Sequence, residues 1–455
     1  MTPERESSSC GPRREAMTET VTSWGGLTVR ASERRSENLQ HITNGVALSR
    51  GLGRSYGDSS LPAEAGGAVV GTVLADRILG FDEATGVLRA EAGLSLAELN
   101  RVFLRRGWFT PVSPGTMFVT LGGMVAADVH GKNHHQAGCF GAHVLRLKMR
   151  VADGRIVECS REQHADLFLA TLGGMGLTGH VLEVEFKMTR VASPWILAET
   201  EQIENIDQFI TGLKQAGDAW PMTVGWIDCL SRGRSMGRGI LMRGRWATAD
   251  EAPAHHPKPL RRITVPFDLP EFLLCRPTVR LFNECYYRAH GRGVRRRILH
   301  PEKWFYPLDA ILHWNRIYGR RGFTQYQCLL PERGGRAAIR RFFELLTAKG
   351  GASFLCVIKD HGDEGDGMLS FPMRGTSIAL DMAVRDDTPA IVDALNACVI
   401  EEGGRVYLAK DRFTREPDFR AMEPRLAAWE RVRQAWDPQR LIRSAQSVRL
   451  LGDRV

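Results

Sequence analysis

The chain has 455 residues, 43% hydrophobic and 25% charged, which predicts a globular protein of two or three domains. No apolar run of roughly 18 residues occurs, so the sequence predicts no transmembrane helix. The net charge of +9 favours anionic partners such as phosphates, lipid headgroups or nucleic acid. The nine cysteines form no C-x-x-C pair, which argues against a disulfide framework and favours a reducing compartment.

The first 17 residues are polar and charged, and we expect a disordered lead there, with Met17 as a candidate start. No apolar segment follows Arg13-Arg14, so we expect no signal peptide and a cytoplasmic protein. Residues 18–190 are rich in glycine and short apolar runs, which predicts several strands. Asp153-Gly154 predicts a hairpin, and we expect helices from Ser95, with Glu98 as its capping-box partner, and over 164–172, closed by Gly173.

Residues 191–403 contain less glycine and predict a second domain. Strands are expected at 223–230, 322–331, 350–360 and 376–384, and helices at 337–349 and 389–403. Residues 252–297 combine Pro, His and Arg with apolar groups and predict a mobile excursion. Residues 404–455 turn back and are expected to end in one helix over 418–437, stopped by Pro438. The pattern is α+β, without βαβ repetition.

A glycine-rich loop, residues 51–58, directly follows an apolar run. Its spacing fits neither the Rossmann fingerprint nor a P-loop. Unshielded backbone N–H groups in such a loop can converge on a diphosphate, to which Arg54 would add charge. The alternative is a tight hairpin turn.

Two further loops carry small and polar residues. Residues 114–135 place four small residues ahead of His130, His134 and His135. A metal site is disfavoured because Gly131 and Asn133 break the helix that it would need, and solvated or capping histidines remain an alternative. Residues 173–179 form the last loop, for which a helix C-cap is the alternative. Together the three loops predict a site for an extended ligand with a diphosphate and a planar ring system.

Seven motifs carry a family resemblance: RGLGRSYGD, PGT, VT-GG, D-HGKNHH, GGMGLTG, WNR-YG--GF-QYQ, and Y-AKD with a terminal W---R---DP. In this order they resemble the vanillyl-alcohol oxidase/p-cresol methylhydroxylase superfamily of FAD-binding proteins, from about Trp24 to Leu450. The resemblance implies a two-domain α+β flavoprotein. Residues 18–190 and the returning 404–455 would form a bipartite FAD-binding domain, and 191–403 an antiparallel-sheet substrate domain.

The resemblance implies FAD as the cofactor. Relatives with covalent flavin carry a linking His in the first glycine loop, where this chain has Arg54, so we expect non-covalent FAD. The implied FAD-binding residues are Gly51, Leu52, Gly53, Arg54, Ser55, Tyr56, Gly57, Pro114, Gly115, Thr116, Thr120, Gly122, Gly123, Asp128, His130, Gly131, Asn133, His134, His135, Gly174, Gly176, Leu177, Thr178, Gly179 and Tyr407.

Oxidation of a secondary alcohol needs a hydride acceptor, which a flavin supplies, and a base for the hydroxyl proton. Lys410 matches the family's active-site lysine and is the candidate base if burial lowers its pKa. Its alternative is a surface lysine paired with Asp411. Tyr56 is a candidate proton relay, against simple ring packing, and His130 resembles the family's histidine beside the flavin.

The implied substrate-binding residues are Trp226, Tyr318, Gln325, Gln327, Lys359, Ser377, Ala379 and Lys410. For the two glutamines and Lys359 the alternative is alternation on a half-exposed strand, with Tyr326 in the core. Well-known members carry Asn and a pocket Cys where this chain has Ser377 and Ala379, so inhibitors that trap that thiol should not trap this protein.

Through HGKNHH and GLGRSYGD the chain resembles one subgroup of this superfamily in particular. The resemblance implies that the protein oxidises C2 of a polyprenylphosphoryl-β-D-ribofuranose to a 2-keto sugar, which a nicotinamide-dependent short-chain reductase would convert to the arabinose donor for cell-wall arabinan. The basic stretches SRGRSMGRGILMRGR and RGVRRR, together with FDLPEFLLC, suggest contact with the inner face of the plasma membrane. The alternative is that the basic stretches are ordinary solvated surface. Nucleic acid is disfavoured. The alternatives are a soluble aldonolactone or alditol oxidase and a flavin-free binding or scaffold protein.

Overall fold

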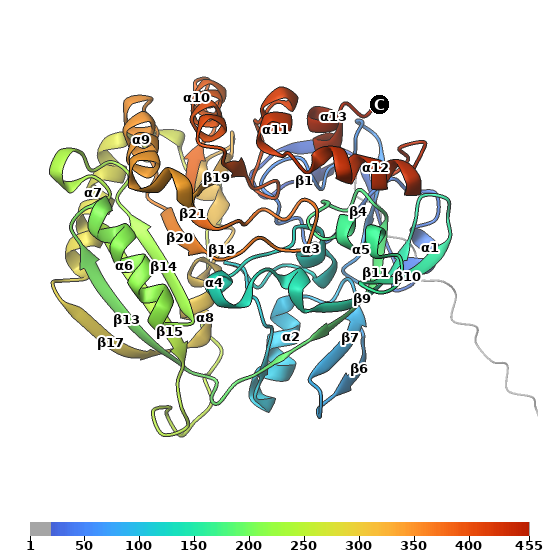
Figure 1. Cartoon of the computed structure of the whole chain (residues 1–455), viewed down its shortest axis with the longest axis horizontal. Helices are drawn as coiled ribbons and strands as arrows, with labels where there is room; N and C mark the ends of the chain where they lie inside the picture. The colour runs from blue at the N-terminus through green and yellow to red at the C-terminus, as the bar shows by residue number, and fades with distance from the viewer. Residues whose placement is uncertain (1–19, 455) are drawn as a thin grey trace, which may run out of the picture.

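A computed structural model describes residues 20–454, so the predicted N-terminal lead lies outside the described residues. The N-terminal part, blue to teal in Figure 1, contains two main sheets. A parallel sheet has the order β3 (Ser32–Arg35), β5 (Ala68–Gly71), β4 (Ser49–Arg50). An antiparallel sheet has the order β10 (Ile156–Ser160), β9 (Val144–Arg150), β11 (His180–Lys187), β7 (Val87–Glu91), β6 (Ile78–Asp82). The smaller elements are β1 (Thr20–Thr22), β2 (Thr28–Arg30), β8 (Trp108–Phe109), β12 (Thr189–Arg190), α1 (Leu39–Ile42), α3 (Leu121–Ala126) and α4 (His134–Ala137).

Several elements of this part form where turn and capping residues in the sequence predict them. β9 and β10 form the hairpin predicted at Asp153-Gly154, where Gly154 has a φ of 88°. Helix α2 (Leu96–Phe103) begins after Ser95, whose hydroxyl accepts the Glu98 N–H at 3.1 Å. The expected capping box is incomplete, since the Glu98 carboxylate pairs with Arg101 instead. Helix α5 (Ala165–Thr171) is followed by Gly173 in the left-handed region, as predicted.

The second part is built on an eight-stranded sheet, on the left of Figure 1. Its order is β17 (Val294–Leu299), β13 (Ile196–Ile203), β15 (Gly239–Trp246), β14 (Met222–Ile227), β20 (Cys356–His361), β21 (Gly375–Ala383), β19 (Phe323–Pro331), β22 (Arg405–Val406). Helices α6 (Ile206–Ala219), α9 (Gly335–Ala348) and α10 (Thr388–Glu401) pack on one face through a shared apolar core. All pairings in this sheet are antiparallel, which confirms the α+β fold.

The period of two along the central strands gives the sheet two different faces. On β19, Tyr326 and Cys328 join the core under the helices, whereas Gln325 and Gln327 alternate with them. On β21, Ile378 joins the same core. Because polar side chains occupy the alternate positions, the face opposite the helices is the one that supplies polar groups to a site. Strand β19 is buried along its whole length, so it is not the half-exposed strand of the alternative interpretation.

One prediction about secondary structure is wrong. The single terminal helix expected over 418–437 is divided into α11 (Glu416–Met422) and α12 (Leu426–Trp436), because Pro424 has no N–H to continue it, and α13 (Ala445–Leu451) follows them. The residues of the expected mobile excursion, 252–297, contain a two-residue strand β16 (Ile263–Thr264), helix α7 (Arg276–Ala289) and most of β17. Near it lie α8 (Pro301–Phe305) and β18 (Ile311–Leu312), which pairs with β16.

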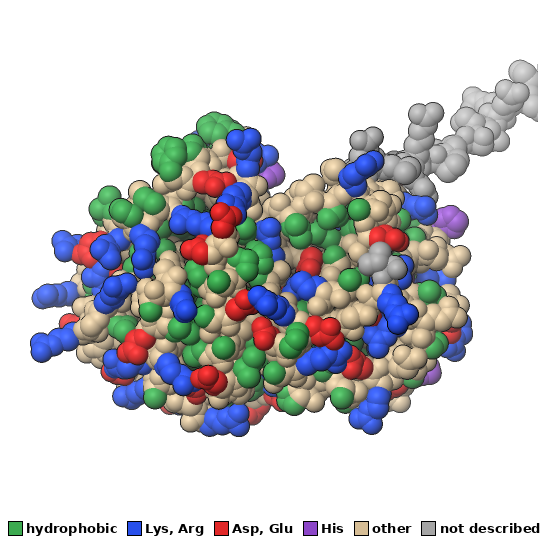
Figure 2. All heavy atoms as spheres, turned by 90° about the horizontal axis from the view of Figure 1, so that it is seen from above, with side chains coloured by type: hydrophobic (Ala, Val, Ile, Leu, Met, Phe, Trp, Pro, Cys, Tyr) green, Lys and Arg blue, Asp and Glu red, His purple; other side chains and the backbone are tan. Residues whose placement is uncertain are grey.

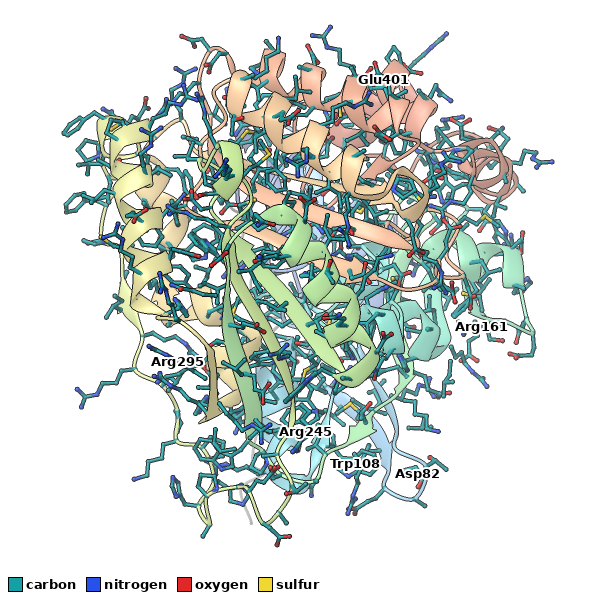
Figure 3. The ribbon with its side chains drawn as sticks, turned by 60° about the vertical axis from the view of Figure 1, so that its left-hand side comes forward. Asp82, Trp108, Arg161, Arg245, Arg295 and Glu401 are labelled. Carbon is teal, nitrogen blue, oxygen red and sulfur yellow. The ribbon has the colours of Figure 1, made fainter. Side chains whose placement is uncertain are left out.

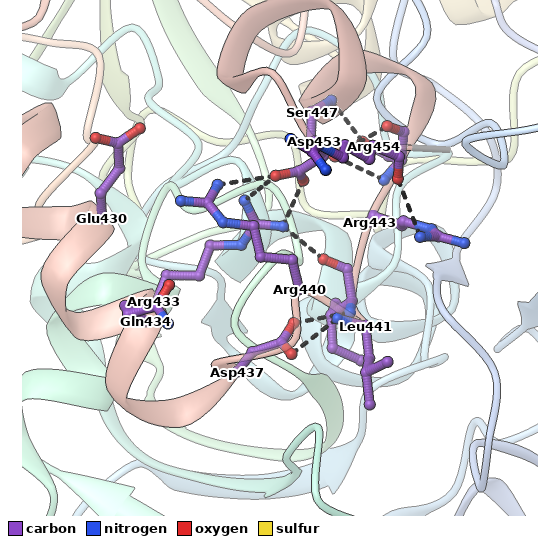
Figure 4. Close-up of polar contacts among 12 residues, drawn as sticks. Glu430, Arg433, Gln434, Asp437, Arg440, Leu441, Arg443, Ser447, Asp453 and Arg454 are labelled. Carbon is purple, nitrogen blue, oxygen red and sulfur yellow. Dashed lines mark hydrogen bonds and ion pairs between the residues drawn. The ribbon is translucent and has the colours of Figure 1, made fainter.

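The C-terminal segment returns across the N-terminal part, as the red helices of Figure 1 show. The Trp429 indole of α12 donates to the carbonyl of Ala170 on α5 at 2.9 Å. Figure 4 shows the buried ion pair that holds this return together: Arg433 donates to both carboxylate oxygens of Asp453, at 3.0 and 2.6 Å, beyond α13 (Ala445–Leu451). We propose 18–190, 191–403 and 404–455 as the domain limits. None of the described helices is long and apolar enough to cross a membrane.

Candidate active site

Every predicted loop starts from a defined element. Residues 51–57 follow β4, 114–116 lie between β8 and α3, and 120–123 open α3. Residues 128–135 join α3 to α4, and 174–179 join α5 to β11. The first loop meets the returning segment directly, because the Tyr56 N–H donates to Ala409 O at 3.0 Å. Gly57 is required there, since a Cβ would lie 1.9 Å from the Asp411 carbonyl oxygen.

The loop after α3 is fixed by buried polar contacts. Thr120 caps α3, and its hydroxyl lies where a Cβ on Gly51 would be, so the first two loops touch. Asp128 accepts from the Gly141 N–H at 2.7 Å and from the Ser370 hydroxyl. The Tyr407 hydroxyl donates to the carbonyl of Ala127 at 3.0 Å. The loop that carries His130 is therefore held by the C-terminal segment as well as by its own helix.

Three buried imidazoles lie beside one another. The ring of His361 is 5.2 Å from that of His130 and 4.7 Å from that of His134. The Gln327 amide donates to His130 Nε2 at 2.9 Å, which leaves the proton on Nδ1. Burial, and then nearby positive charge that includes Lys359, holds the pKa of His130 well below its usual range. His130 is therefore a neutral donor at physiological pH.

Lys410 lies in a second cluster, on the segment that follows β22. Its Nζ is 4.0 Å from the centre of the Tyr56 ring. Burial lowers the pKa of Lys410 to about 7, against the raising effect of Asp381. Asp381 is 1% exposed and accepts from Gln325 at 2.5 Å and from the Tyr318 hydroxyl at 3.2 Å. The lysine is half-buried, so it is available as a base near neutral pH.

Two more lysines belong to the same region. Burial lowers the pKa of Lys359 to about 8 and that of Lys132 to about 7, and Lys359 lowers the pKa of both Lys132 and Lys410. Lys132 donates to the carbonyl of Phe305 at 3.2 Å. Three lysines near one another, opposed chiefly by Asp381, favour an anionic substrate. Lys410, Tyr56, His130, Tyr318, Gln325, Gln327 and Lys359 are thus the predicted residues that the structure joins through these contacts.

Sequence reasoning did not select three residues of this site. Lys132 stands within HGKNHH and could have been selected as a charged residue between the histidines. His361 donates to, or accepts from, Ser377 at 2.7 Å, and Asp381 anchors Gln325; no local motif indicates either. Both lie on strands whose partners are distant in sequence.

Other predicted residues lie at the margin or elsewhere. Ala379 faces Gln327 across the sheet register, whereas Trp226 donates to Phe354 O at 2.9 Å and packs on Tyr286 of α7. His135 contacts Trp220 O at 2.9 Å. Leu177 joins the apolar cluster of α12, and Thr178 shares a hydrogen bond of 2.9 Å with Thr171, so the last glycine loop also supports packing. Asn133 donates to Pro111 O, and Thr116 to Asp309.

Buried polar atoms in the loops test the fit to FAD. Arg54 Nε, His130 Nδ1 and His134 Nε2 are buried and have no hydrogen-bond partner among the described residues. The Arg54 guanidinium lies over Trp24 at 4.0 Å, and the Asp309 carboxylate nearby offsets part of its charge. A buried arginine with an unpartnered Nε, together with unpartnered imidazole nitrogens, fits an anionic ligand rich in acceptors, such as a dinucleotide. The residues present therefore fit FAD.

Comparison with known proteins agrees with this geometry. Residues 42–160 match the model of the FAD binding domain. "Decaprenylphosphoryl-beta-D-ribose oxidase" of Mycolicibacterium smegmatis is 34% identical over 414 residues, which are 89% of this chain and 88% of that protein. "Uncharacterized protein in mprA 5'region" of Streptomyces coelicolor is 31% identical over 78% of this chain and 100% of its own length. Mouse L-gulonolactone oxidase is 27% identical over only 30% of this chain and 31% of its own.

The region aligned with the Mycolicibacterium protein, 89% of this chain, is long enough to include both the glycine loops and the sheet that carries Gln327, Lys359 and Asp381. The match to the lactone oxidase extends over less than a third of the chain. The chain belongs to the vanillyl-alcohol oxidase/p-cresol methylhydroxylase superfamily of FAD-dependent oxidoreductases, within the family of decaprenylphosphoryl-β-D-ribose oxidase.

Proposed function

We propose that this protein oxidises the C2 hydroxyl of a polyprenylphosphoryl-β-D-ribofuranose to the 2-keto sugar. The observation that carries the proposal is the half-buried Lys410, with its lowered pKa, beside Tyr56 in a chain with an FAD-binding domain. The name of the Mycolicibacterium relative supports ribose attached to a lipid phosphate as the substrate. The excess of lysine at the site supports a phosphorylated substrate.

Non-covalent FAD, when bound, supplies the hydride acceptor for this oxidation. The chain's own residues handle the proton and the orientation. Lys410, neutral above about pH 7, takes the proton of the C2 hydroxyl at Nζ. Burial raises the pKa of the Asp381 carboxyl group, which accepts from Tyr318 and Gln325, and its ionised form offsets the positive charge that Lys410 gains with the proton. His130 presents an Nδ1–H whose direction is fixed by Gln327.

The test is turnover of a short-chain, water-soluble polyprenylphosphoryl ribose, with dye reduction as the readout and mass spectrometry to detect the 2-keto product. Lys410→Ala should lose about 10²-fold or more in kcat while keeping the flavin absorbance. The exposed Lys187→Ala is the matched control and should keep its activity. Turnover of an aldonolactone with oxygen, together with no turnover of the lipid-linked sugar, would favour the lactone-oxidase alternative.

The remaining parts of the proposal concern the cofactor's attachment, partners and location. Flavin that passes into the supernatant after acid precipitation would establish a non-covalent FAD. The 2-keto product requires a reductant to become a new sugar epimer, and we propose a nicotinamide-dependent short-chain reductase for that step. We also propose that the protein works in the cytoplasm at the inner face of the membrane, since its substrate has a lipid tail.

A further inference from the structure

Rows of site side chains lie on the face of the eight-stranded sheet opposite its helices, here termed the inner face. In Figure 3, α6 (green) lies on the viewer's side of the strands, and the inner face is turned toward the rest of the molecule, where Gln327 meets His130. Asp381 and Ser377 are four residues apart on β21, which is about 13 Å along the strand. The inner face is therefore elongated, with the proposed base at one end and Ser377 at the other. From the end near Lys410, the strand register gives three rows: Gln325 with Asp381, Gln327 with Ala379, and Ser377 with Lys359.

The far end of the inner face holds a buried pair, His361 and Ser377. His361 is the last residue of β20, and its Nε2 shares a hydrogen bond of 2.7 Å with the Ser377 hydroxyl. Its other ring nitrogen, Nδ1, is buried and has no hydrogen-bond partner within residues 20–454. Figure 2 shows other histidine side chains (purple) at the surface, where water can satisfy their nitrogens. His361 is only 3% exposed, so its Nδ1 needs a ligand or an ordered water as partner.

The charge state of His361 indicates the kind of group that it can meet. Burial, and then the positive charge of neighbours that include His134, holds the pKa of His361 well below its usual range, so the ring is neutral at physiological pH. The Ser377 hydroxyl can give or accept the proton of their hydrogen bond, so Nδ1 is an acceptor in one arrangement and a donor in the other. A sugar hydroxyl both donates and accepts, and it fits either arrangement. An ionised phosphate only accepts, and it is better matched by the lysines.

The length of the inner face selects one hydroxyl of the sugar. Hydrogen bonds of about 3 Å at both ends of a span of about 13 Å leave about 7 Å for the sugar itself. The C3 hydroxyl of a ribofuranose is next to C2, so it stays near Lys410. The C5 hydroxyl is the free hydroxyl farthest from C2. It is therefore the group that can extend to the end of the inner face where His361 lies.

We propose that His361 and Ser377 form a specificity subsite that binds the C5 hydroxyl of the sugar while C2 lies at Lys410. This inference rests on the proposed function for the identity of the sugar. Ala379 lies in the row between the two ends, and its side chain is a single methyl group, so it leaves room for a sugar to extend past it. The competing partner of His361 Nδ1 is an ordered water, which would make the reaction indifferent to the C5 hydroxyl.

The experiment compares two water-soluble substrates, the short-chain polyprenylphosphoryl ribose and its 5-deoxy analogue, by dye reduction with the FAD-loaded full chain. We expect the wild-type kcat/KM to be at least about ten-fold higher for the ribose, because the analogue leaves the buried nitrogen unpartnered. In His361→Phe the ring remains but both nitrogens are lost, so this ratio should fall to about 1. His361→Asn places an amide atom near the position of Nδ1 and should keep part of the ratio. The matched control is the exposed His41→Phe, which should keep the wild-type ratio.

The ratio separates recognition from folding, since a variant that loses flavin or stability loses activity on both substrates alike. A wild-type ratio of about 1, or a wild-type ratio retained in His361→Phe, would overturn the subsite while the oxidised ribose still supports the proposed function. If His361→Phe yields no flavoprotein, Ser377→Ala decides, because the ring then loses the hydrogen bond that fixes its direction: a reduced ratio supports the subsite and an unchanged one overturns it. If the wild type oxidises neither substrate, the proposed function fails and this inference fails with it.

Discussion

The rate of oxidation should follow the protonation of Lys410. Its pKa near 7, against an ordinary 10.5, means that about a tenth of the molecules carry the neutral amine at pH 6 and about nine tenths at pH 8. An unperturbed lysine would be less than about 1% neutral at pH 8. We therefore expect kcat/KM on the soluble substrate to rise about ten-fold between pH 6 and pH 8, with its midpoint near 7.

The variant Asp381→Asn tests the cause of that midpoint. The Asp381 carboxylate raises the pKa of Lys410 by favouring the ammonium form, so its removal should lower that pKa. The pH at which kcat/KM reaches half of its maximum should therefore fall by about one unit in the variant. Because the two groups titrate together, the wild-type limb describes the pair and the variant limb describes the lysine alone.

The assay is dye reduction under saturating and limiting substrate, with flavin absorbance at each pH as the control for cofactor loss. A limb that stays in place in Asp381→Asn, or moves to higher pH, would refute the coupling. A flat profile in the wild type would refute the role of Lys410 as base. Loss of flavin in the variant would be visible in the spectrum and is separate from either result.

Two further outcomes concern stability and cofactor retention. Arg433→Met removes the bidentate partner of the buried Asp453 carboxylate and leaves only Arg440 beside it, so it should cost about 2 kcal/mol of unfolding free energy. Arg420→Met, at an exposed pair, should cost less than about 1 kcal/mol, and denaturant unfolding distinguishes the two variants. Gly57→Ala would place a methyl group against the Asp411 carbonyl oxygen, so the returning segment would have to shift. We expect the purified variant to show a lower ratio of flavin to protein absorbance. An unchanged ratio would contradict this close packing.

Sequence reasoning succeeded where the cause is local. The hairpin at Asp153-Gly154 and the start of α2 after Ser95 depend on a few neighbouring residues. The site depends instead on distant pairings: Asp381 meets Gln325 through β19 and β21, and His361 lies beside His130 only because the sheet packs on the FAD-binding part. No spacing in the sequence encodes these contacts, which is why the family resemblance supplied Lys410 but not Asp381.

The position of Lys410 is the product of both halves of the fold. Directly before the lysine, the short strand β22 pairs with β19 of the eight-stranded sheet. In the same segment, the Tyr407 hydroxyl donates to the carbonyl of Ala127. Beyond it, Arg449 donates to Asp58 of the first loop and to Asp411. The lysine therefore stands on a segment that is bonded to the sheet, to the histidine loop and to the first glycine loop at once. A base on either part alone would follow that part's movements, so the return of the chain would hold the proposed base at a fixed position relative to both the glycine loops and the eight-stranded sheet.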